Sequence, residues 1–142
     1  MPQINGIAEV ALYVDDINIA TKFYEDVLGL IKTAQFGDST FLQTGPNDTL
    51  ILFQRDTLAS RKSIIPGHGS EGQGHVALAI SSEEIDAWRQ HLINMNVEIE
   101  HEQDWSQGTH SIYFRDPDQN SIELIEARHY PAVWAKIQGQ AS

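Results

Sequence analysis

The sequence predicts an α+β fold built from two β-α-β-β-β modules. Three observations support this prediction. First, Glu9–Val14 (EVALYV) and His75–Ile80 (HVALAI), which begin 66 positions apart, share the alternating apolar pattern of a half-buried strand. Second, a segment of helical periodicity follows each of these strands. Third, each half continues with extended segments that are joined by turns rich in Pro, Asp and Asn.

The first module has a helix directly after its first strand. Apolar residues recur at spacings of three and four after Asp15 and Asp16, as they do on the buried face of a helix. Gly29 is expected to end this helix, because glycine readily adopts the left-handed conformation that often follows a helix. The remaining extended segments of the module are expected at residues 31–36, 40–44 and 49–54, with a turn at 45–48.

The second module repeats this order of elements. Its helix is expected after Ile80, with a capping box from Ser81 to Glu84. The apolar stripe of this helix consists of Ile85, Trp88, Leu92 and Met95. Extended segments are expected at residues 97–100, 111–115 and 121–125, with a turn at 116–120.

The domain organisation follows from the chain length of 142 residues, which corresponds to one domain. Module one is expected at about residues 5–54 and module two at about 75–126, with a C-terminal tail at 127–142. The connection at 55–74 contains Pro66 and several glycines and is expected to be mobile. Loops of this length inside a compact domain are usually either functional or disordered.

Composition excludes several classes of protein. The hydrophobic share of 41% is typical of a globular chain, and the net charge of −11 argues against a nucleic-acid partner. No apolar run is long enough to span a membrane, and the N-terminus lacks a signal-peptide pattern. We therefore expect a cytoplasmic protein. Because the chain has no Cys, a metal ion would have to be held by its 6 His or its 20 Asp and Glu residues.

Three of these residues are candidate metal ligands. His75 and Glu9 open the two matching strands, so their side chains would converge if the modules pack about a pseudo-twofold axis. Glu123 lies in mid-strand between Ile122 and Leu124, and burying a carboxylate is costly unless it is paired or bound to a cation. The alternatives are a hydrogen-bonded structural role for His75 and a water-facing sheet surface for Glu123.

Other chemically active side chains are weaker candidates. Tyr113 lies on the strand before Glu123 and either points into the same cavity or packs in the core. His110 has the opposite parity to Tyr113 and is expected to face solvent or a loop. His68, in the glycine-rich connection, is either a lid residue or a solvated loop histidine. Trp105 precedes the Tyr113 strand and is a candidate for the mouth of a site.

The repeated strands and the segment SIYFRDPDQNSIELIE resemble the vicinal oxygen chelate superfamily. This superfamily includes glyoxalase I, fosfomycin-resistance thiol transferases, extradiol dioxygenases and bleomycin-binding proteins. The resemblance extends from about Ile7 to Glu126 and implies that the two modules form a curved mixed sheet around a metal cleft. It also implies a small-molecule substrate and a homodimer, often with each site built from both chains.

The resemblance also implies roles for particular residues. The family places metal ligands on the first and last strands of its modules, which correspond here to Glu9, His75 and Glu123. The metal would be Mn²⁺, Fe²⁺, Ni²⁺ or Zn²⁺, and two carboxylates with one imidazole favour Mn²⁺ or Fe²⁺. Glu123 would also be the catalytic base, while Tyr113 would orient the substrate or donate a hydrogen bond to it.

The chain departs from each subfamily at one position or more. The fourth ligand of glyoxalase I would fall at Ile51, or at Leu52 with a one-residue slip, and neither residue can bind a metal. Extradiol dioxygenases and fosfomycin transferases usually have His where this chain has Glu9, and Gln119 replaces the usual turn glycine. The ligand count favours a dioxygenase-like or transferase-like enzyme over a glyoxalase-like lyase. The alternative class is a metal-free small-molecule binding protein of the bleomycin-resistance type.

Overall fold

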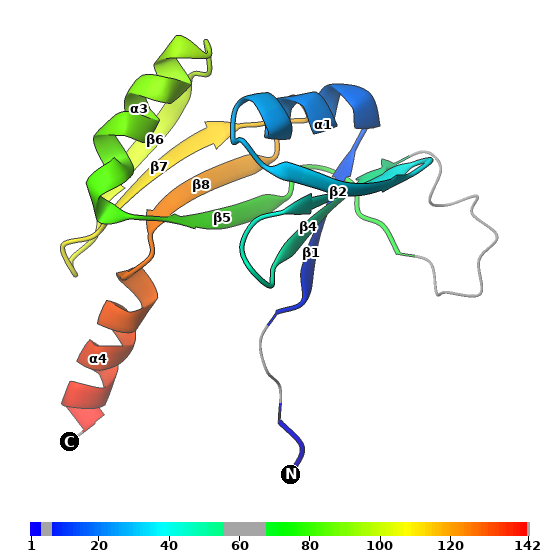
Figure 1. The fold of residues 1–142 in the computed structure, drawn as a ribbon. Coiled ribbons are helices and arrows are strands. Elements are labelled where there is room, and N and C mark those ends of the chain that lie inside the picture. Colours follow the sequence, from blue (N-terminus) through cyan, green and yellow to red (C-terminus); the bar gives the residue numbers. More distant parts are fainter. Residues whose placement is uncertain (4–6, 56–67, 142) are drawn as a thin grey trace. The chain divides into compact units, whose positions relative to one another are not determined.

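The computed structural model describes residues 1–3, 7–55 and 68–141, and it contains two four-stranded mixed sheets (Figure 1). The predicted α+β fold of two β-α-β-β-β modules is confirmed. The chain divides into two compact units. The first unit comprises Met1–Gly74 and the short segment Asp116–Asn120, and the second comprises His75–Arg115 and Ser121–Ser142.

The first unit holds one sheet and one helix. Strand β1 runs parallel to β4, and β4, β3 and β2 are antiparallel neighbours in the sheet order β1-β4-β3-β2. Helix α1 lies against β4 and β3 (Figure 1). The elements are β1 Glu9–Val14, α1 Ile17–Asp26, β2 Ile31–Phe36, β3 Ser39–Gln43 and β4 Thr49–Gln54.

Helix α1 begins and ends as its sequence predicts. The side chain of Asp16 accepts hydrogen bonds from the backbone amides of Asn18 and Ile19, and so caps the first turn. Gly29 follows the helix with a φ of +67°, which glycine adopts without strain. Ala20 and Tyr24 of its apolar stripe are fully buried, and the helix contacts β4 and β3.

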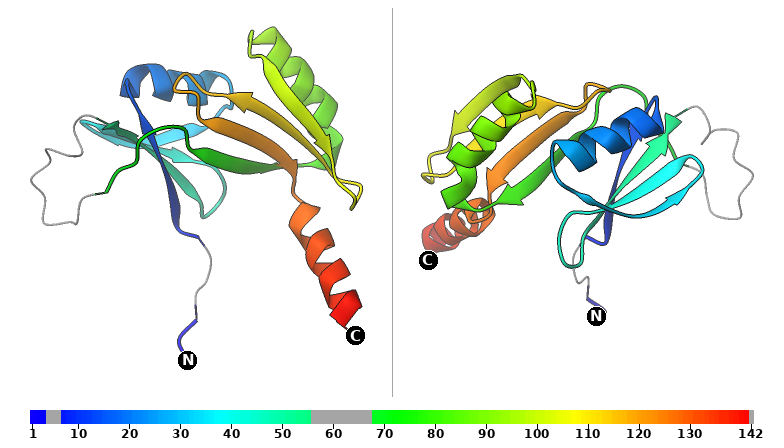
Figure 2. Two further views of the ribbon diagram at one scale, coloured as in Figure 1. Left: turned by 180° about the vertical axis from the view of Figure 1, so that it is seen from behind. Right: turned by 45° about the horizontal axis from the view of Figure 1, so that its top comes forward.

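The second unit repeats this plan and adds a C-terminal helix. Its sheet has the order β5-β8-β7-β6, with β5 parallel to β8 and the other pairs antiparallel. Helix α3 lies against β6 (Figure 2). The elements are β5 His75–Ile80, the 3₁₀ turn η1 Ser82–Glu84, α3 Ile85–Asn94, β6 Ile99–Asp104, β7 His110–Arg115, β8 Ser121–Glu126 and α4 His129–Ala141.

Two predictions for the segments on either side of α3 are wrong: the capping box before the helix and the start of the strand after it. Ser81 makes no side-chain cap, because the chain forms a 3₁₀ turn there before the helix begins at Ile85. The strand expected at 97–100 begins at Ile99 and continues to Asp104. It begins late because Asn96 has a φ of 58° and the amide of Val97 still donates to a carbonyl of the helix, 2.9 Å away.

One segment outside the two modules has more secondary structure than the sequence predicts. The expected C-terminal tail forms helix α4 over His129–Ala141. Most of the predicted connection, residues 56–67, lies outside the described residues, although Arg55 at its start is ion-paired with Asp15 at 2.6 Å. Among the described residues, no helix is both long and apolar enough to cross a membrane.

The turn at Asp116–Asn120, which is part of the first unit, is held there by side-chain hydrogen bonds. The Tyr24 hydroxyl donates to the Asp116 carboxylate at 2.8 Å, and the amide of Gly74 donates to the side chain of Asn120 at 2.6 Å. Burial, followed by the neighbouring Asp116, raises the pKa of Tyr24 well above its usual value. Gln119 has a φ of 66°, the conformation that the glycine usual at this place would adopt easily. The turn sequence therefore has a structural role.

Candidate functional site

The second sheet brings His75 and Glu123 together. In the parallel pairing of β5 with β8, Ala77 lies opposite Glu123 and His75 lies two residues earlier, so the side chains of His75 and Glu123 share a face. Nε2 of His75 is 3.4 Å from Oε1 of Glu123. The Glu123 residue is only 7% exposed, whereas the His75 side chain is 51% exposed. The buried Glu123 carboxylate thus lies beside a half-exposed imidazole ring.

The second ring nitrogen of His75 determines what this pair can bind. Nδ1 lies 3.0 Å from the carbonyl oxygen of Ser121. A carbonyl only accepts, so Nδ1 carries a hydrogen, and in the neutral tautomer with this hydrogen Nε2 presents a lone pair to the Glu123 carboxylate. Two acceptors that face one another repel unless a cation or a proton lies between them.

The same geometry fits a metal ion. Histidines that ligate metals commonly donate their other ring N–H to a backbone carbonyl or a carboxylate. Two N or O ligands, each about 2.0–2.2 Å from one ion, lie roughly 3.0–3.5 Å apart. The observed separation of 3.4 Å between His75 and Glu123 falls within this range.

A buried hydroxyl holds the other oxygen of Glu123. The Ser111 hydroxyl donates to Oε2 of Glu123 at 2.7 Å, and the indole N–H of Trp105 donates to the Ser111 oxygen at 2.9 Å. Ser111 is not among the site residues that the sequence predicts. Its parity could have revealed it, because residues two apart on a strand share a face and Ser111 precedes the candidate Tyr113 by two.

Tyr113 lies next to this pair. It is directly opposite Glu123 in the antiparallel pairing of β7 with β8. Its pKa is raised, first by burial and then by the Glu123 carboxylate, so the phenol remains a hydrogen-bond donor at neutral pH. His101 on β6 is opposite Tyr113 in turn, with the two ring centroids 5.9 Å apart. One face of the second sheet therefore carries an imidazole, a carboxylate and a phenol side by side.

Glu9, the third predicted ligand, belongs to the first unit. It is the first residue of β1, lies opposite Thr49 and is exposed. Within the described parts of the chain, no three His, Asp or Glu side chains lie close enough together to share a metal ion. The participation of Glu9 with His75 and Glu123 therefore stays a prediction.

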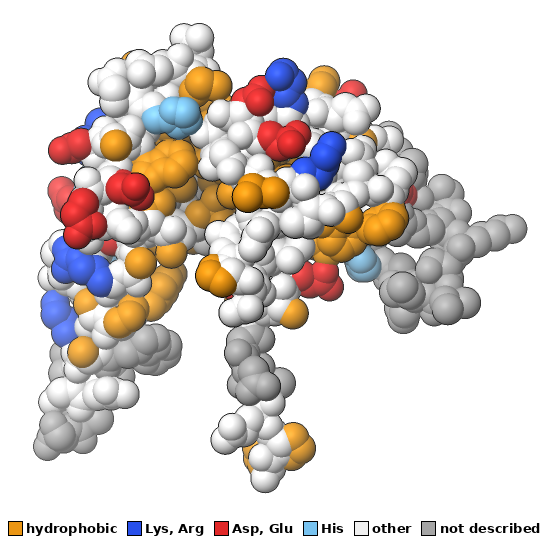
Figure 3. All heavy atoms as spheres, viewed as in Figure 1, with side chains coloured by type: hydrophobic (Ala, Val, Ile, Leu, Met, Phe, Trp, Pro, Cys, Tyr) orange, Lys and Arg blue, Asp and Glu red, His pale blue; other side chains and the backbone are white. Residues whose placement is uncertain are grey.

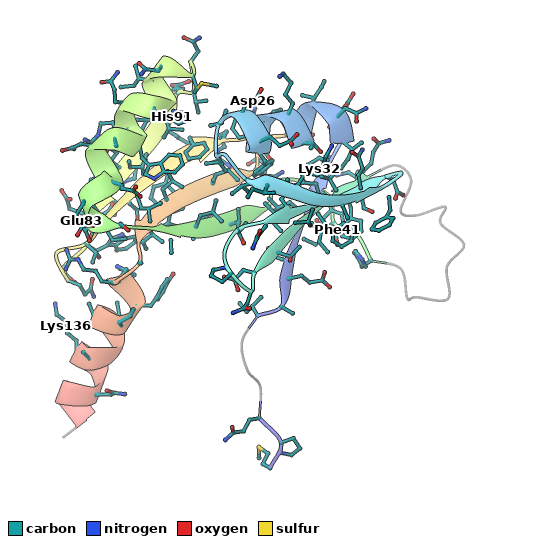
Figure 4. All side chains as sticks on the ribbon, in the orientation of Figure 1. Asp26, Lys32, Phe41, Glu83, His91 and Lys136 are labelled. Carbon is teal, nitrogen blue, oxygen red and sulfur yellow. The ribbon has the colours of Figure 1, made fainter. Side chains whose placement is uncertain are left out.

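The first sheet has no carboxylate at the position that matches Glu123. Ala11 lies opposite Ile51 in the β1–β4 pairing, just as Ala77 lies opposite Glu123 in the second sheet. The equivalent residue is therefore Ile51 and not Leu52. Ile51 is 3% exposed and packs with aromatic side chains, among them Phe41, which is labelled in Figure 4. This face of the first sheet is apolar where the second carries its polar cluster.

The expectation that His110 faces solvent or a loop is wrong. Its ring nitrogens lie 2.7 Å from Glu102 and 2.7 Å from Asp104, on the sheet face opposite Tyr113, and Arg89 of α3 also binds Glu102. The alternation along the strand places His110 on the correct face of the sheet, but this face contacts α3 and is not a solvent-facing surface. Burial alone would lower the pKa of His110, yet its hydrogen bonds to Glu102 and Asp104 outweigh this effect and raise it.

His68 has partners that the sequence left open. His68, the candidate lid or loop residue, is exposed but hydrogen-bonds the Tyr13 hydroxyl at 2.6 Å and contacts the Phe53 ring.

On the face shown in Figure 3, Lys and Arg side chains lie beside Asp and Glu side chains rather than in a basic patch. This distribution fits the net charge of −11.

Known proteins resemble the chain over most of its length. The model of the Glyoxalase/Bleomycin resistance protein/Dioxygenase superfamily matches residues 6–124. Fosfomycin resistance protein FosX of Listeria monocytogenes is 28% identical over 128 residues, which cover 85% of this chain and 89% of FosX. Metallothiol transferase FosB of Staphylococcus epidermidis is 28% identical over 123 residues, covering 86% of this chain and 82% of FosB.

Solved structures agree with this assignment. The crystal structure of lactoylglutathione lyase from Agrobacterium tumefaciens is 33% identical and superimposes with a TM-score of 0.84, covering 94% of this chain and 98% of that one. Because both the family model and this structure span nearly the whole chain, the resemblance seen in the sequence is confirmed. The chain belongs to the glyoxalase/bleomycin resistance protein/dioxygenase superfamily, that is, to the vicinal oxygen chelate proteins.

Proposed function

We propose that this protein is a divalent-metal-dependent enzyme in which Glu9, His75 and Glu123 hold the ion. The observation that carries the proposal is that Nε2 of His75 lies 3.4 Å from an oxygen of the buried Glu123, while Nδ1 of the same ring lies 3.0 Å from the Ser121 carbonyl. We further propose that the two modules, residues 5–54 and 75–126, act together as one domain. Enzyme names among the relatives, such as metallothiol transferase and lactoylglutathione lyase, support this choice over a metal-free binding protein.

The proposed substrate is a small molecule that binds through two neighbouring oxygens. A bound divalent ion supplies Lewis acidity, which stabilises negative charge on a substrate oxygen. The Tyr113 phenol, one strand away from Glu123, donates a hydrogen bond to the substrate and orients it. The buried position of Glu123 keeps its charge away from water, where it would be screened.

The donor set favours Mn²⁺ or Fe²⁺ over Ni²⁺ and Zn²⁺, because two carboxylates and one imidazole are comparatively hard ligands. A relative supports Mn²⁺ in particular. A mutant of Listeria monocytogenes FosX, 25% identical to this chain with a TM-score of 0.65, was solved in complex with Mn(II) and 1S,2S-dihydroxypropylphosphonic acid.

The apolar Ile51 favours three protein ligands over four. Three ligands leave more coordination positions open, which suits a transferase-like or dioxygenase-like reaction. The names fosfomycin resistance protein and metallothiol transferase make fosfomycin, with a thiol as nucleophile, the first substrate to test. A lyase acting on hemithioacetals is the second candidate, favoured by the 33% identity to lactoylglutathione lyase. In that reaction Glu123 would also accept the substrate proton.

We also propose a homodimer, since twofold dimers are the commonest soluble assemblies. In such a dimer, the Glu9 that completes a site would come either from the same chain or from the second copy.

Metal analysis of protein purified without chelator tests the site. Wild type should hold one divalent ion per chain, and His75→Ala should lose most of it while remaining folded. His91→Ala on α3 is the matched control and should keep its metal. A metal-free wild type, or full metal content in His75→Ala, contradicts the proposed site.

Activity assays then separate the reaction types. The metal-loaded enzyme is incubated with fosfomycin and a thiol, with hemithioacetals, and with catechols under oxygen monitoring. Hemithioacetal isomerisation with no turnover of fosfomycin or catechols would replace the first candidate by the second. Metal binding without turnover of any of them would remove all three reaction types.

A further inference from the structure

We infer that Ser111 and Trp105 form a relay that positions the Glu123 carboxylate for its metal ion. This inference rests on the proposed function. Trp105 donates its indole N–H to the Ser111 oxygen at 2.9 Å, and Ser111 donates its hydroxyl hydrogen to Oε2 of Glu123 at 2.7 Å. Neither Ser111 nor Trp105 is a ligand; both act through Glu123.

The direction of the relay follows from the chemistry of the donors. An indole N–H can only donate, so the Ser111 oxygen must accept from Trp105. A hydroxyl hydrogen otherwise rotates freely about its C–O bond. With the Trp105 hydrogen on one side of the oxygen, the Ser111 hydrogen is directed to Glu123. Ser111 is 0% exposed, so solvent does not compete for this hydrogen bond.

The relay gives the two oxygens of Glu123 different tasks. The terminal torsion of a glutamate is broad, so the carboxylate has no strong rotational preference of its own. The bond from Ser111 holds Oε2 in the interior, which leaves Oε1 facing Nε2 of His75. The orientation that a metal ion would need is thereby present before the ion binds.

The fold holds Trp105 firmly in place. It lies in the turn between β6 and β7, where its amide donates to the carbonyl of Thr109 at 2.8 Å and its carbonyl accepts from Gly108 at 2.9 Å. Its ring also contacts that of the buried His129, with centroids 5.2 Å apart, and a ring nitrogen of His129 lies 2.6 Å from the Thr109 hydroxyl. The donor at the start of the relay is fixed by the turn and by the first residue of α4.

The test measures the affinity of the full chain for Mn²⁺ alone, by calorimetric titration. Ser111→Ala should weaken Mn²⁺ binding by about 10–100-fold, the usual effect of removing a group that orients a ligand. Trp105→Phe should weaken it by a smaller factor. The double variant should bind no more weakly than Ser111→Ala, because Trp105 acts only through Ser111.

A matched control separates positioning from general stability. Thr40→Val removes another fully buried hydroxyl, which accepts from Thr21 at 3.0 Å in the first unit. It should lower the melting temperature about as much as Ser111→Ala and leave Mn²⁺ affinity unchanged. Ser111→Thr, which restores the hydroxyl, should recover Mn²⁺ affinity to within a few-fold of wild type.

The outcomes distinguish the two proposals. If wild type binds Mn²⁺ and Ser111→Ala binds it equally well, the relay is wrong and the metal site stands. If Ser111→Ala and Trp105→Phe weaken Mn²⁺ binding by independent factors that multiply in the double variant, the relay is also wrong. If wild type binds no Mn²⁺, the proposed function and the relay are both wrong.

Discussion

Replacing Glu123 by Gln should raise the stability of the metal-free protein and abolish its stabilisation by metal. In wild type, Nε2 of His75 lies 3.4 Å from a carboxylate oxygen of Glu123, and in the neutral tautomer of His75 this nitrogen presents a lone pair to that oxygen. In Glu123→Gln, the amide oxygen accepts from Ser111 and the amide N–H₂ donates to His75. The substitution thus replaces two facing acceptors by a hydrogen bond and removes a charge from a residue that is only 7% exposed.

The size of the effect can be worked out from these contacts. One new hydrogen bond contributes about 0.5–1.5 kcal/mol. For a chain of 142 residues, each kcal/mol corresponds to roughly 3–5 °C in melting temperature. Metal at 100 times its dissociation constant would stabilise wild type by about 2.7 kcal/mol but would not stabilise a variant that cannot bind it. Glu123→Gln should therefore melt higher than wild type in chelator and lower than wild type in Mn²⁺.

Calorimetric melting of both proteins, with EDTA and with saturating Mn²⁺, tests this reversal. Glu126→Gln on the same strand is the control. Glu126 is also buried but is ion-paired with Arg128 at 2.7 Å, so its replacement should lower the melting temperature in both buffers. If Glu123→Gln melts lower than wild type in EDTA and Mn²⁺ stabilises neither, Glu123 is instead paired with a protonated His75, and the metal site is refuted.

Three other expectations concern stability and assembly. Because the pKa of His110 is raised, its ion pairs contribute fully to the free energy of unfolding below about pH 6.5, and this contribution is lost as the pH rises through the raised value. When melting temperature is measured against pH, it should therefore fall less on the alkaline side in His110→Gln than in wild type. Gly74→Ala would place a methyl group 2.9 Å from the buried Leu12 and 3.2 Å from the side-chain oxygen of Asn120. It should therefore lower the free energy of unfolding, measured in urea, by about 1–3 kcal/mol. An unchanged urea midpoint would show that the neighbouring side chains move aside without cost. Sedimentation at micromolar concentration should give a dimer, and a monomer would count against the proposed assembly.

The two modules could be predicted from the sequence because their signals are local. Alternation of apolar residues in Glu9–Val14 and His75–Ile80 sets which side of each strand is buried, whatever the strand pairs with. Asp16 and Gly29 mark the start and end of α1 through their own backbone preferences. Glu123 could be singled out for a similar reason, since a carboxylate in an apolar strand needs a partner wherever the strand lies.

Strand register and side-chain partners depend on contacts between distant segments, so only the tertiary structure decides them. The pairing of β1 with β4 makes Ile51, and not Leu52, the counterpart of Glu123. The contact of α3 with β6 turns the face that holds His110 from a solvent-facing surface into an ion-pair cluster.

The chemistry of the site also depends on contacts between distant segments of the chain. The sequence by itself determined that His75 and Glu123 can be ligands, because that property belongs to the residue type. Only the folded sheet places them 3.4 Å apart, turns the N–H of His75 toward the carbonyl of Ser121, and sets Ser111 and Trp105 behind Glu123. Hydrogen bonds of this kind join residues on different strands and turns, so they exist only once the register of the sheet is fixed.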